Sequence, residues 1–355
     1  MKKINVKATD PYDVLIEQGL IEETGRLVAG VTDSKYAAVI TDDIVDGLYS
    51  EKVIASLEKA GFKVVKYVFI NGESSKCFEN LNKIYAFLVD NNITRSDCLI
   101  ALGGGVTGDI TGFAAATYLR GIKYIQIPTT LLAQIDSSVG GKTAVNLPCG
   151  KNLVGAFKQP EIVICDPAVL KTLSEKIVSD GMAEAIKYGM IRSKELFDII
   201  AAHNSENYFE VIDDIVYRCV SIKSDIIRND EFDKGERMLL NFGHTIGHAI
   251  ESFFHYTGYT HGSAVSAGMY AITVQALRNG ICDPKLPDKL SEVLNAYNLP
   301  LKTEADISEL LPLCCNDKKC ESSSINAIIC KDIGVSEIMK MPISEFDAFM
   351  KKNGR

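Results

Sequence analysis

The stretch DCLIALGGGVTGDITGFAAATYL, residues 97–119, decides the fold. Its first part is a short apolar run that predicts a buried parallel strand, and its last part predicts a helix. Between them GGGVTG satisfies the pattern G-x-G-x-x-G, with Gly103, Gly105 and Gly108 at the key places. Such a turn lets the backbone approach a pyrophosphate at the positive end of a helix. Nucleotide binding and a plain structural turn both stay open, because no acidic residue ends a strand about 20 residues later.

Strands and helices alternate on both sides of this turn. From residue 168 onward nearly every segment has helical periodicity, with one short strand pair expected near residues 323–334. The alternation is typical of βαβ units that build an open, mostly parallel, Rossmann-like sheet. We therefore predict an α/β domain over residues 1–167, a mostly α-helical domain over residues 168–355, and a substrate cleft between them. The other predicted strands are 36–42, 62–70, 123–130 and 161–167, and the other helices of this half are 45–61 and 76–92.

Length and charge limit the class of protein. The chain has 355 residues, which suggests about two domains. Its formal net charge of −8 argues against nucleic acid as a partner, because binding a phosphate backbone needs a basic surface. No apolar run has the roughly 18–20 residues of a membrane span, and the first residues show no secretory signal. We expect a small-molecule substrate, no nucleic-acid or membrane partner, and a cytoplasmic location.

The ten cysteines have irregular spacing and form no C-x-x-C pair. In a cytoplasmic chain they are expected to be reduced thiols. Cys314, Cys315 and Cys320 lie close together in the sequence. We interpret this group as buried or partly buried thiols and not as a metal site, because no patterned partner pair accompanies it.

A second glycine-rich stretch, VGGKT at residues 139–143, imitates the end of a phosphate-binding P-loop. The full motif requires a glycine five residues before Gly141, and Asp136 stands there, so we reject this interpretation. Lys142 nevertheless lies beside flexible backbone in a polar segment. Such segments carry function more often than they form plain surface loops.

Histidines concentrate in one part of the sequence. The chain has five, and four of them fall within residues 244–261. In NFGHTIGHAIE, residues 241–251, His244 and His248 are spaced to lie on one face of a helix, as in a zinc site, but the glutamate that follows the first histidine in zinc proteases is absent. His203 is expected at a helix end and His255 in a loop, although the spacing alone leaves His255 open as a ligand.

Arg237 and Asn241 extend this pair into one stripe at helical spacing, 237, 241, 244 and 248. A stripe of this composition predicts a face that lines a polar cavity, because solvated faces usually carry Glu and Lys. A carboxylate could complete a catalytic zinc site with the histidines. Glu184 is a candidate, since Lys187 follows on the same helical face.

Taken together, stretches that run in order over most of the chain resemble the dehydroquinate synthase family of sugar phosphate cyclases. In this family the N-terminal domain holds NAD and the helical domain holds zinc, a site that cobalt or another divalent ion could also fill. No single stretch carries the resemblance, which makes it specific. The stretches are GGGVTGDITGFAAATYLRG, IPTTLLAQIDSSVGGKTAVN, GKNLVGAFKQP, GMAEAIKYG, NFGHTIGHAIE, HGSAVSAGM and DKK.

The resemblance implies roles for individual residues. The implied zinc ligands are Glu184, His244 and His261. The implied NAD contacts are Asp42, Glu73, Lys76, Gly104, Gly105, Asp109, Thr129, Thr130, Thr172 and Leu173. The implied catalytic residues are Lys142, Lys187, Arg237, Asn241 and His248, and the implied substrate contacts are Asp136, Lys151, Asn152, Lys223 and one of Lys318 and Lys319. Arg120 would reach the substrate phosphate of a neighbouring subunit, which implies a homodimer.

The implied substrate is 3-deoxy-D-arabino-heptulosonate 7-phosphate. NAD would oxidise its C5 hydroxyl, phosphate would leave by elimination, the hydride would return, and an intramolecular aldol reaction would close 3-dehydroquinate, a step of the shikimate pathway towards aromatic amino acids. The lysines and Arg237 suit this substrate, because its carboxylate and phosphate need cations inside an acidic protein. Ile44 and Ile177 depart from residues that relatives often carry near NAD, so cofactor affinity can differ.

Two other enzyme types share this plan. Other sugar phosphate cyclases, such as deoxy-inosose or valiolone synthases, tend to alter the stripe that Arg237, Asn241 and His248 form here. A polyol dehydrogenase of the glycerol dehydrogenase type would release NADH and would not need so many anion-binding lysines. A scaffold or sensor protein would have no use for a polar histidine stripe. The sequence therefore favours a dehydroquinate synthase.

Overall fold

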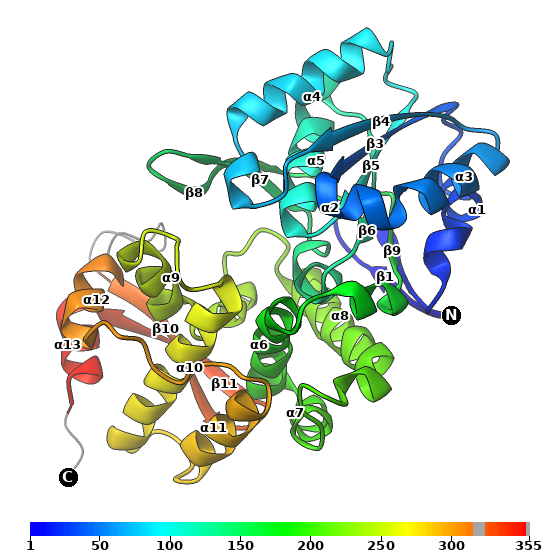
Figure 1. Cartoon of the computed structure of the whole chain (residues 1–355). Helices are drawn as coiled ribbons and strands as arrows, with labels where there is room; N and C mark the ends of the chain where they lie inside the picture. Colours follow the sequence, from blue (N-terminus) through cyan, green and yellow to red (C-terminus); the bar gives the residue numbers. More distant parts are fainter. Residues whose placement is uncertain (315–323, 353–355) are drawn as a thin grey trace. The chain divides into compact units, whose positions relative to one another are not determined.

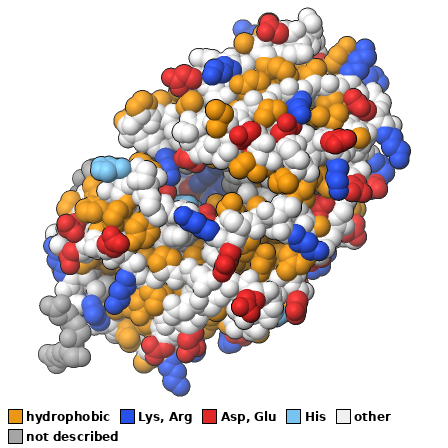
Figure 2. Space-filling view, in the orientation of Figure 1, with side chains coloured by type: hydrophobic (Ala, Val, Ile, Leu, Met, Phe, Trp, Pro, Cys, Tyr) orange, Lys and Arg blue, Asp and Glu red, His pale blue; other side chains and the backbone are white. Residues whose placement is uncertain are grey.

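The computed structural model describes residues 1–314 and 324–352. The chain divides into two compact units, Met1–Leu173 with Lys223–Glu231, and Ser174–Ile222 with Phe232–Arg355. On the face drawn in Figure 2, acidic and basic side chains are interspersed among apolar ones. Among the described helices, none is long and apolar enough to cross a membrane.

The described part of the first unit is built on a seven-stranded sheet with the order β1-β2-β9-β6-β5-β3-β4. The strands β1 and β2 pair antiparallel, and the other neighbours pair parallel. The predicted open, mostly parallel sheet is therefore confirmed. The strands are β1 (Lys2–Val6), β2 (Tyr12–Ile16), β3 (Tyr36–Asp42), β4 (Lys63–Phe69), β5 (Cys98–Gly103), β6 (Lys123–Pro128) and β9 (Ile162–Cys165).

Helices cover both faces of this sheet. Figure 1 shows α1 and α3 on the opposite side from α4 and α5, as right-handed crossovers require when the chain moves first to one edge and then back. Every residue of β5 is buried. Leu99 of β5, Leu88 of α4 and Phe113 of α5 belong to one apolar cluster, and burying each such side chain stabilises the fold by roughly 1.5–3 kcal/mol. The helices are α1 (Thr24–Ala29), α2 (Asp43–Val45), α3 (Glu51–Lys59), α4 (Phe78–Asp90) and α5 (Gly105–Thr117).

The strand order reverses next to β3. From β3 the chain first adds β4 on one side and then β5 on the other. In open α/β sheets, ligands bind outside the carboxyl ends of the strands where the order reverses. Asp42 ends β3 and the glycine turn follows β5, so both features lie at this point. A separate antiparallel hairpin of β7 (Lys142–Leu147) and β8 (Gly150–Phe157) completes the description of this unit.

The second unit is mostly helical, as predicted. Its strand pair is also confirmed, since β10 (Ser324–Asp332) and β11 (Val335–Pro342) form an antiparallel hairpin. The helix α8 is divided, because its residues up to Ile222 count with the second unit and those from Lys223 count with the first. The helices are α6 (Glu175–Arg192), α7 (Lys194–Ala201), α8 (Ile212–Asn229), α9 (His244–Phe253), α10 (His261–Arg278), α11 (Leu286–Ala296), α12 (Ile307–Cys314) and α13 (Ile343–Met350).

Candidate active site

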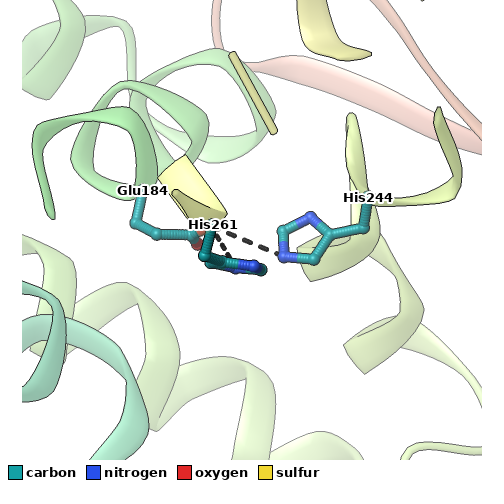
Figure 3. A group of neighbouring side chains, drawn as sticks. All are labelled: Glu184, His244 and His261. Atoms are coloured by element: carbon teal, nitrogen blue, oxygen red, sulfur yellow. Dashed lines mark ion pairs between the residues drawn. The ribbon is translucent and has the colours of Figure 1, made fainter. Parts of the chain in front are cut away.

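Three side chains with metal-binding atoms converge in the second unit. Glu184 of α6 is fully buried, and its Oε1 lies 3.5 Å from His244 Nε2 and 3.4 Å from His261 Nε2. Figure 3 shows the three side chains pointing toward one another from three helices. A tetrahedral Zn²⁺ with ligands at about 2.1 Å keeps neighbouring ligand atoms about 3.4 Å apart. The donor set and its separations therefore fit a divalent metal ion.

The start of α9 aims His244 into this cluster. The residue before it, Gly243, has a left-handed backbone with φ 78°. A Cβ at Gly243 would lie 2.5 Å from Met269 Cγ and 2.7 Å from the carbonyl oxygen of Val265, both on α10. Only glycine satisfies both the backbone angle and this close approach. The turn therefore fixes where α9 begins and where its first side chain points.

This turn makes the prediction of one continuous helical stripe wrong. Arg237 and Asn241 lie on a separate 3-10 helix, η8 (Glu236–Asn241), and α9 starts only at His244. The physical reason is the backbone of Phe242 (ψ 125°) and Gly243 (φ 78°), whose angles lie outside the α-helical region and separate η8 from α9. Arg237 is buried, so it stays a candidate for an anion-binding cation, but its place does not follow from helical spacing.

The start of α10 is fixed against α6. The backbone N–H of Gly262 donates to Asp180 Oδ1 at 2.5 Å, and a Cβ at Gly262 would lie 2.2 Å from the Asp180 carbonyl oxygen. Asp180 is one helical turn before Glu184 on α6. This contact therefore holds His261, the residue just before Gly262, beside the Glu184 carboxylate.

We expect Gly243→Ala to destabilise the protein more than Gly258→Ala. Both glycines have positive φ, 78° and 88°, so alanine strains the backbone at each. A Cβ at Gly258 meets nothing within 4 Å, whereas one at Gly243 meets Met269 and Val265. The extra cost at Gly243 is about 1–3 kcal/mol, the usual cost of overpacking. Thermal denaturation of both variants measures it, and equal melting temperatures would refute the packing argument.

The electrostatic environment shifts the pKa values of His244 and His261 in opposite directions. Burial lowers the pKa of His244 well below its usual value, so its ring is neutral and offers a lone pair. Burial also lowers the pKa of His261, but hydrogen bonds to Glu184 and Glu251 outweigh it and raise that pKa to about 10. Two buried carboxylates thus favour a positive charge in this pocket. A divalent cation would supply that charge.

Two further predicted residues lie at the cluster. Lys187, almost fully buried, forms an ion pair with Glu184 through the oxygen that does not face the histidines. The His248 ring lies 5.5 Å from the His244 ring and 6.2 Å from the His261 ring, between centroids. The structure also places the two remaining histidines as predicted, His203 just after α7 and His255 in an exposed loop.

The predicted NAD residues all follow carboxyl ends of parallel strands in the first unit. Asp42 ends β3 and caps α2, because its Oδ1 accepts from the N–H groups of Ile44 and Val45. Thr107 Oγ1 of α5 also donates to Asp42 Oδ2, at 3.4 Å, which joins the ends of β3 and β5. The others follow β4 (Glu73, Lys76), β5 (Gly104, Gly105, Asp109), β6 (Thr129, Thr130) and β9 (Thr172, Leu173).

The glycine turn fits a pyrophosphate. Gly104 is the N-cap residue of α5 and has no side chain to accept from the first N–H groups of the helix. A Cβ at Gly104 would come within 3.1 Å of Thr130, and one at Gly105 within 3.1 Å of Ser137 Oγ. The missing side chains leave the backbone open at a positive helix end, which is the arrangement that binds phosphate groups.

A polar network connects predicted cofactor and substrate residues within the first unit. Lys76 forms an ion pair with Asp109. Asn146 of β7 donates from its side chain to Glu73 Oε1 at 2.7 Å and from its backbone to the Lys76 carbonyl oxygen at 2.8 Å. Its Oδ1 accepts from the N–H of Asn152 at 2.9 Å. The hairpin that carries Asn152 is thereby tied to the segment after β4.

Asp136 and Lys223 also meet. Lys223 Nζ donates to both Asp136 Oδ1 and the Asp136 carbonyl oxygen, at 2.7 Å each. Asp136 lies in a π-helical turn, η5 (Ala133–Ser137), a conformation that is frequent at functional sites. The remaining predicted cations of this unit, Lys142 and Lys151, lie on β7 and β8. Lys318 and Lys319 lie outside the described residues, as do Cys315 and Cys320.

Arg120 occupies a strained, exposed turn. Leu119 and Arg120 have φ of 50° and 65°, and Gly121 follows with φ 118°. Left-handed backbone at a non-glycine residue costs on the order of 1–3 kcal/mol and persists where the surroundings enforce it. Arg95 Nε contributes by donating to the Leu119 carbonyl oxygen at 2.9 Å. The turn after α5 therefore presents Arg120 as an exposed residue of the first unit.

Comparison with known proteins decides the family. A family model described as 3-dehydroquinate synthase N-terminal matches residues 66–180, and one described as 3-dehydroquinate synthase C-terminal matches residues 181–320. The chain belongs to the 3-dehydroquinate synthase family. The 3-dehydroquinate synthase of Clostridium acetobutylicum is 46% identical over 342 residues, which cover 96% of each chain. Members of the family are lyases of the sugar phosphate cyclase type, so this chain is an enzyme of that class.

Solved structures confirm the fold class of this 3-dehydroquinate synthase family member. A 2-deoxy-scyllo-inosose synthase complexed with carbaglucose-6-phosphate, NAD⁺ and Co²⁺ aligns with a TM-score of 0.87 and 23% identity, over 99% of this chain and 100% of that one. A 2-epi-5-epi-valiolone synthase from Streptomyces hygroscopicus with NAD⁺ and Zn²⁺ bound gives 0.86 and 24%, over 96% and 95%. At these identities the likeness concerns the fold alone.

In this member of the 3-dehydroquinate synthase family, the sequence did not predict three residues that position the candidate site residues. Glu251, buried on α9, accepts from His261, and Asp180 fixes the start of α10. Asn146 connects Glu73 to Asn152. Only Glu251 carried a usable signal, because it follows His248 by three residues and therefore shares its helical face.

Proposed function

We propose that the chain converts 3-deoxy-D-arabino-heptulosonate 7-phosphate to 3-dehydroquinate and phosphate, with NAD and a divalent metal, Zn²⁺ or Co²⁺. The observation that carries this proposal is the cluster of Glu184, His244 and His261, with Lys187 paired to its carboxylate. A simple phosphate-binding protein would not need such a donor set. The reaction belongs to the shikimate pathway, and we propose that it takes place in the cytoplasm.

The bound groups would supply two kinds of chemistry: NAD takes up and returns a hydride, and the metal ion is a Lewis acid for substrate oxygen. The protein would hold NAD through the glycine turn and the polar residues at the strand ends, and the metal through the three ligands of the cluster. The fit of both groups rests on the open helix end of α5 and on the 3.4–3.5 Å separations around Glu184 Oε1.

The chain's own side chains bind the anionic substrate. A carboxylate and a phosphate dianion need several cations to leave water, and Arg237 can clamp an oxyanion with two parallel hydrogen bonds. His248 is proposed to move a proton at the phosphate end, where its ring nitrogens can both donate and accept. The proposed substrate residues are Lys142, Lys151, Asn152, Asp136, Lys187, Lys223, Arg237, Asn241, His248 and one of Lys318 and Lys319.

One assay tests the proposed reaction. The enzyme is incubated with the heptulosonate phosphate, a catalytic amount of NAD and Zn²⁺, and both phosphate release and the cyclic product are followed. We expect phosphate release that far exceeds the NAD supplied, without net NADH, because the hydride returns in each turnover. Net NADH without phosphate release would instead indicate a polyol dehydrogenase, and a different cyclic product would indicate another sugar phosphate cyclase.

We further propose a homodimer in which Arg120 serves the neighbouring subunit's site. Arg120→Ala and Lys142→Ala, each inactive alone, are expected to restore activity when subunits are mixed and exchanged. In a mixed dimer one site has an intact Lys142 and receives an intact Arg120 from the other subunit, so random exchange gives about a quarter of wild-type activity. If Arg120 acted within its own subunit, the mixture would stay inactive. Light scattering gives the oligomeric state independently.

A further inference from the structure

Glu251 lies behind one of the three proposed metal ligands. Its carboxylate is buried, with 4% of the residue exposed, and Oε2 lies 3.4 Å from His261 Nδ1. The other ring nitrogen of His261, Nε2, faces Glu184 Oε1 at 3.4 Å. The imidazole therefore stands between two buried carboxylates, one on each of its nitrogens.

The second histidine of the cluster is held in a different way. His244 Nε2 also faces Glu184 Oε1, at 3.5 Å, but its Nδ1 lies 3.1 Å from the backbone carbonyl oxygen of Phe242. A carbonyl oxygen is a neutral acceptor, whereas Glu251 is a charged one. Both imidazoles thus turn Nε2 toward Glu184, but the Nδ1 of His244 faces a neutral carbonyl oxygen and the Nδ1 of His261 faces a carboxylate.

A ring nitrogen that binds a metal must carry a lone pair, so the proton of the neutral imidazole has to be on the other nitrogen. A carboxylate that accepts this proton fixes the tautomer, orients the ring and makes the ligating nitrogen more basic. We propose that Glu251 is a positioning residue that holds His261 with Nδ1–H outward and Nε2 toward the metal. This inference rests on the proposed metal centre and adds a residue to it.

A direct role for Glu251 as a ligand is the competing possibility. Ligand atoms of His248, Glu251 and His261 also lie within 4.8 Å of one another. A metal held there in addition to the first would require His261 to give up the proton on both nitrogens. The geometry favours the single-metal arrangement, because one neutral imidazole can serve Glu251 as donor and the metal as ligand at the same time.

The test measures metal binding and not turnover. Glu251→Gln keeps the shape of the side chain and removes its charge. Glu292→Gln is the control, because it removes one carboxylate from the exposed surface of α11 in the same unit. Zn²⁺ affinity is measured by competition with a chelator, metal content per chain by elemental analysis, and the Co²⁺ form by visible absorption. We expect Glu251→Gln to bind one metal per chain about 10- to 100-fold more weakly, and Glu292→Gln to bind as wild type.

Each other result has a defined meaning. Wild-type affinity in Glu251→Gln overturns the inference and leaves the metal centre standing. A fall from two metals per chain to one makes Glu251 a direct ligand and also overturns it. Absence of metal from the wild-type protein refutes the proposed centre itself. If Glu251→Gln fails to fold, Glu251→Asp is titrated with Zn²⁺ in its place. Aspartate keeps the negative charge but has a shorter side chain, which places the carboxylate farther from His261. This variant is also expected to bind the metal more weakly than wild type.

Discussion

His244→Ala is expected to lose the metal ion and the activity together. The substitution removes one of three donor atoms and leaves Glu184 and His261 in a buried pocket with an incomplete set of ligands. A Lewis acid is worth several kcal/mol of transition-state stabilisation, so kcat is expected to fall by at least about a hundredfold. Elemental analysis of the purified variant and the phosphate-release assay measure the two losses, and Glu184→Ala is expected to behave in the same way.

The matched control is His203→Ala. His203 follows α7, and its Nδ1 lies 2.8 Å from the Ile199 carbonyl oxygen, outside the metal cluster. We expect full metal content and activity in this variant. Zinc at wild-type stoichiometry in His244→Ala would show that His244 is not a ligand. Circular dichroism of both variants separates loss of the metal from loss of the fold.

His248→Ala is expected to keep the metal and lose turnover. His248 is one turn along α9 from His244, and its ring lies 5.5 Å from the His244 ring, so it can reach substrate near the metal without being required to hold it. Loss of a positioned proton-transfer group costs typically about 10²–10⁴-fold in rate. The measurement is kcat at saturating substrate together with metal content.

The contrast between the two variants distinguishes the proposed metal ligand, His244, from the proposed proton-transfer residue, His248. If His248→Ala lost its metal as His244→Ala does, then His248 would also be needed to hold the metal, and the proposed division of roles between the two histidines would be wrong. If it kept both metal and turnover, the proton would have to move through another group. A fall in kcat of about 10²–10⁴-fold with full metal content agrees with the proposed role.

The sequence predicted the α/β unit well because its signals are local. A continuous apolar run predicts β5, the glycine turn predicts its end, and helical periodicity predicts α5, all within residues 97–119. The meeting of Asp42 with the glycine turn also follows from order alone, since carboxyl ends of parallel strands share one edge of a sheet. Such features need no knowledge of distant contacts.

The break before α9 could not be predicted in this way. The stretch from Arg237 to His248 has helical spacing, and nothing within it demands a left-handed residue. The break lies at Phe242 and Gly243, and Met269 and Val265 on α10 leave no room for a Cβ at Gly243, so only glycine fits there. Tertiary packing overrides periodicity at such a position. Glycine itself was the only local sign, and glycines also occur within regular helices.

The divided helix α8 has a consequence for how the protein is made. The first unit includes Lys223–Glu231, whose Glu231 accepts hydrogen bonds from the backbone N–H of Thr9 and the side chain of Gln159. A ribosome must therefore synthesise all of Ser174–Ile222 before the first unit has its last segment. Its folding cannot be completed in the usual N-to-C succession, in which one domain is finished before the next emerges. A gene fragment that stops at Leu173 would encode the seven strands of the sheet but not the segment Lys223–Glu231 that belongs to the same unit.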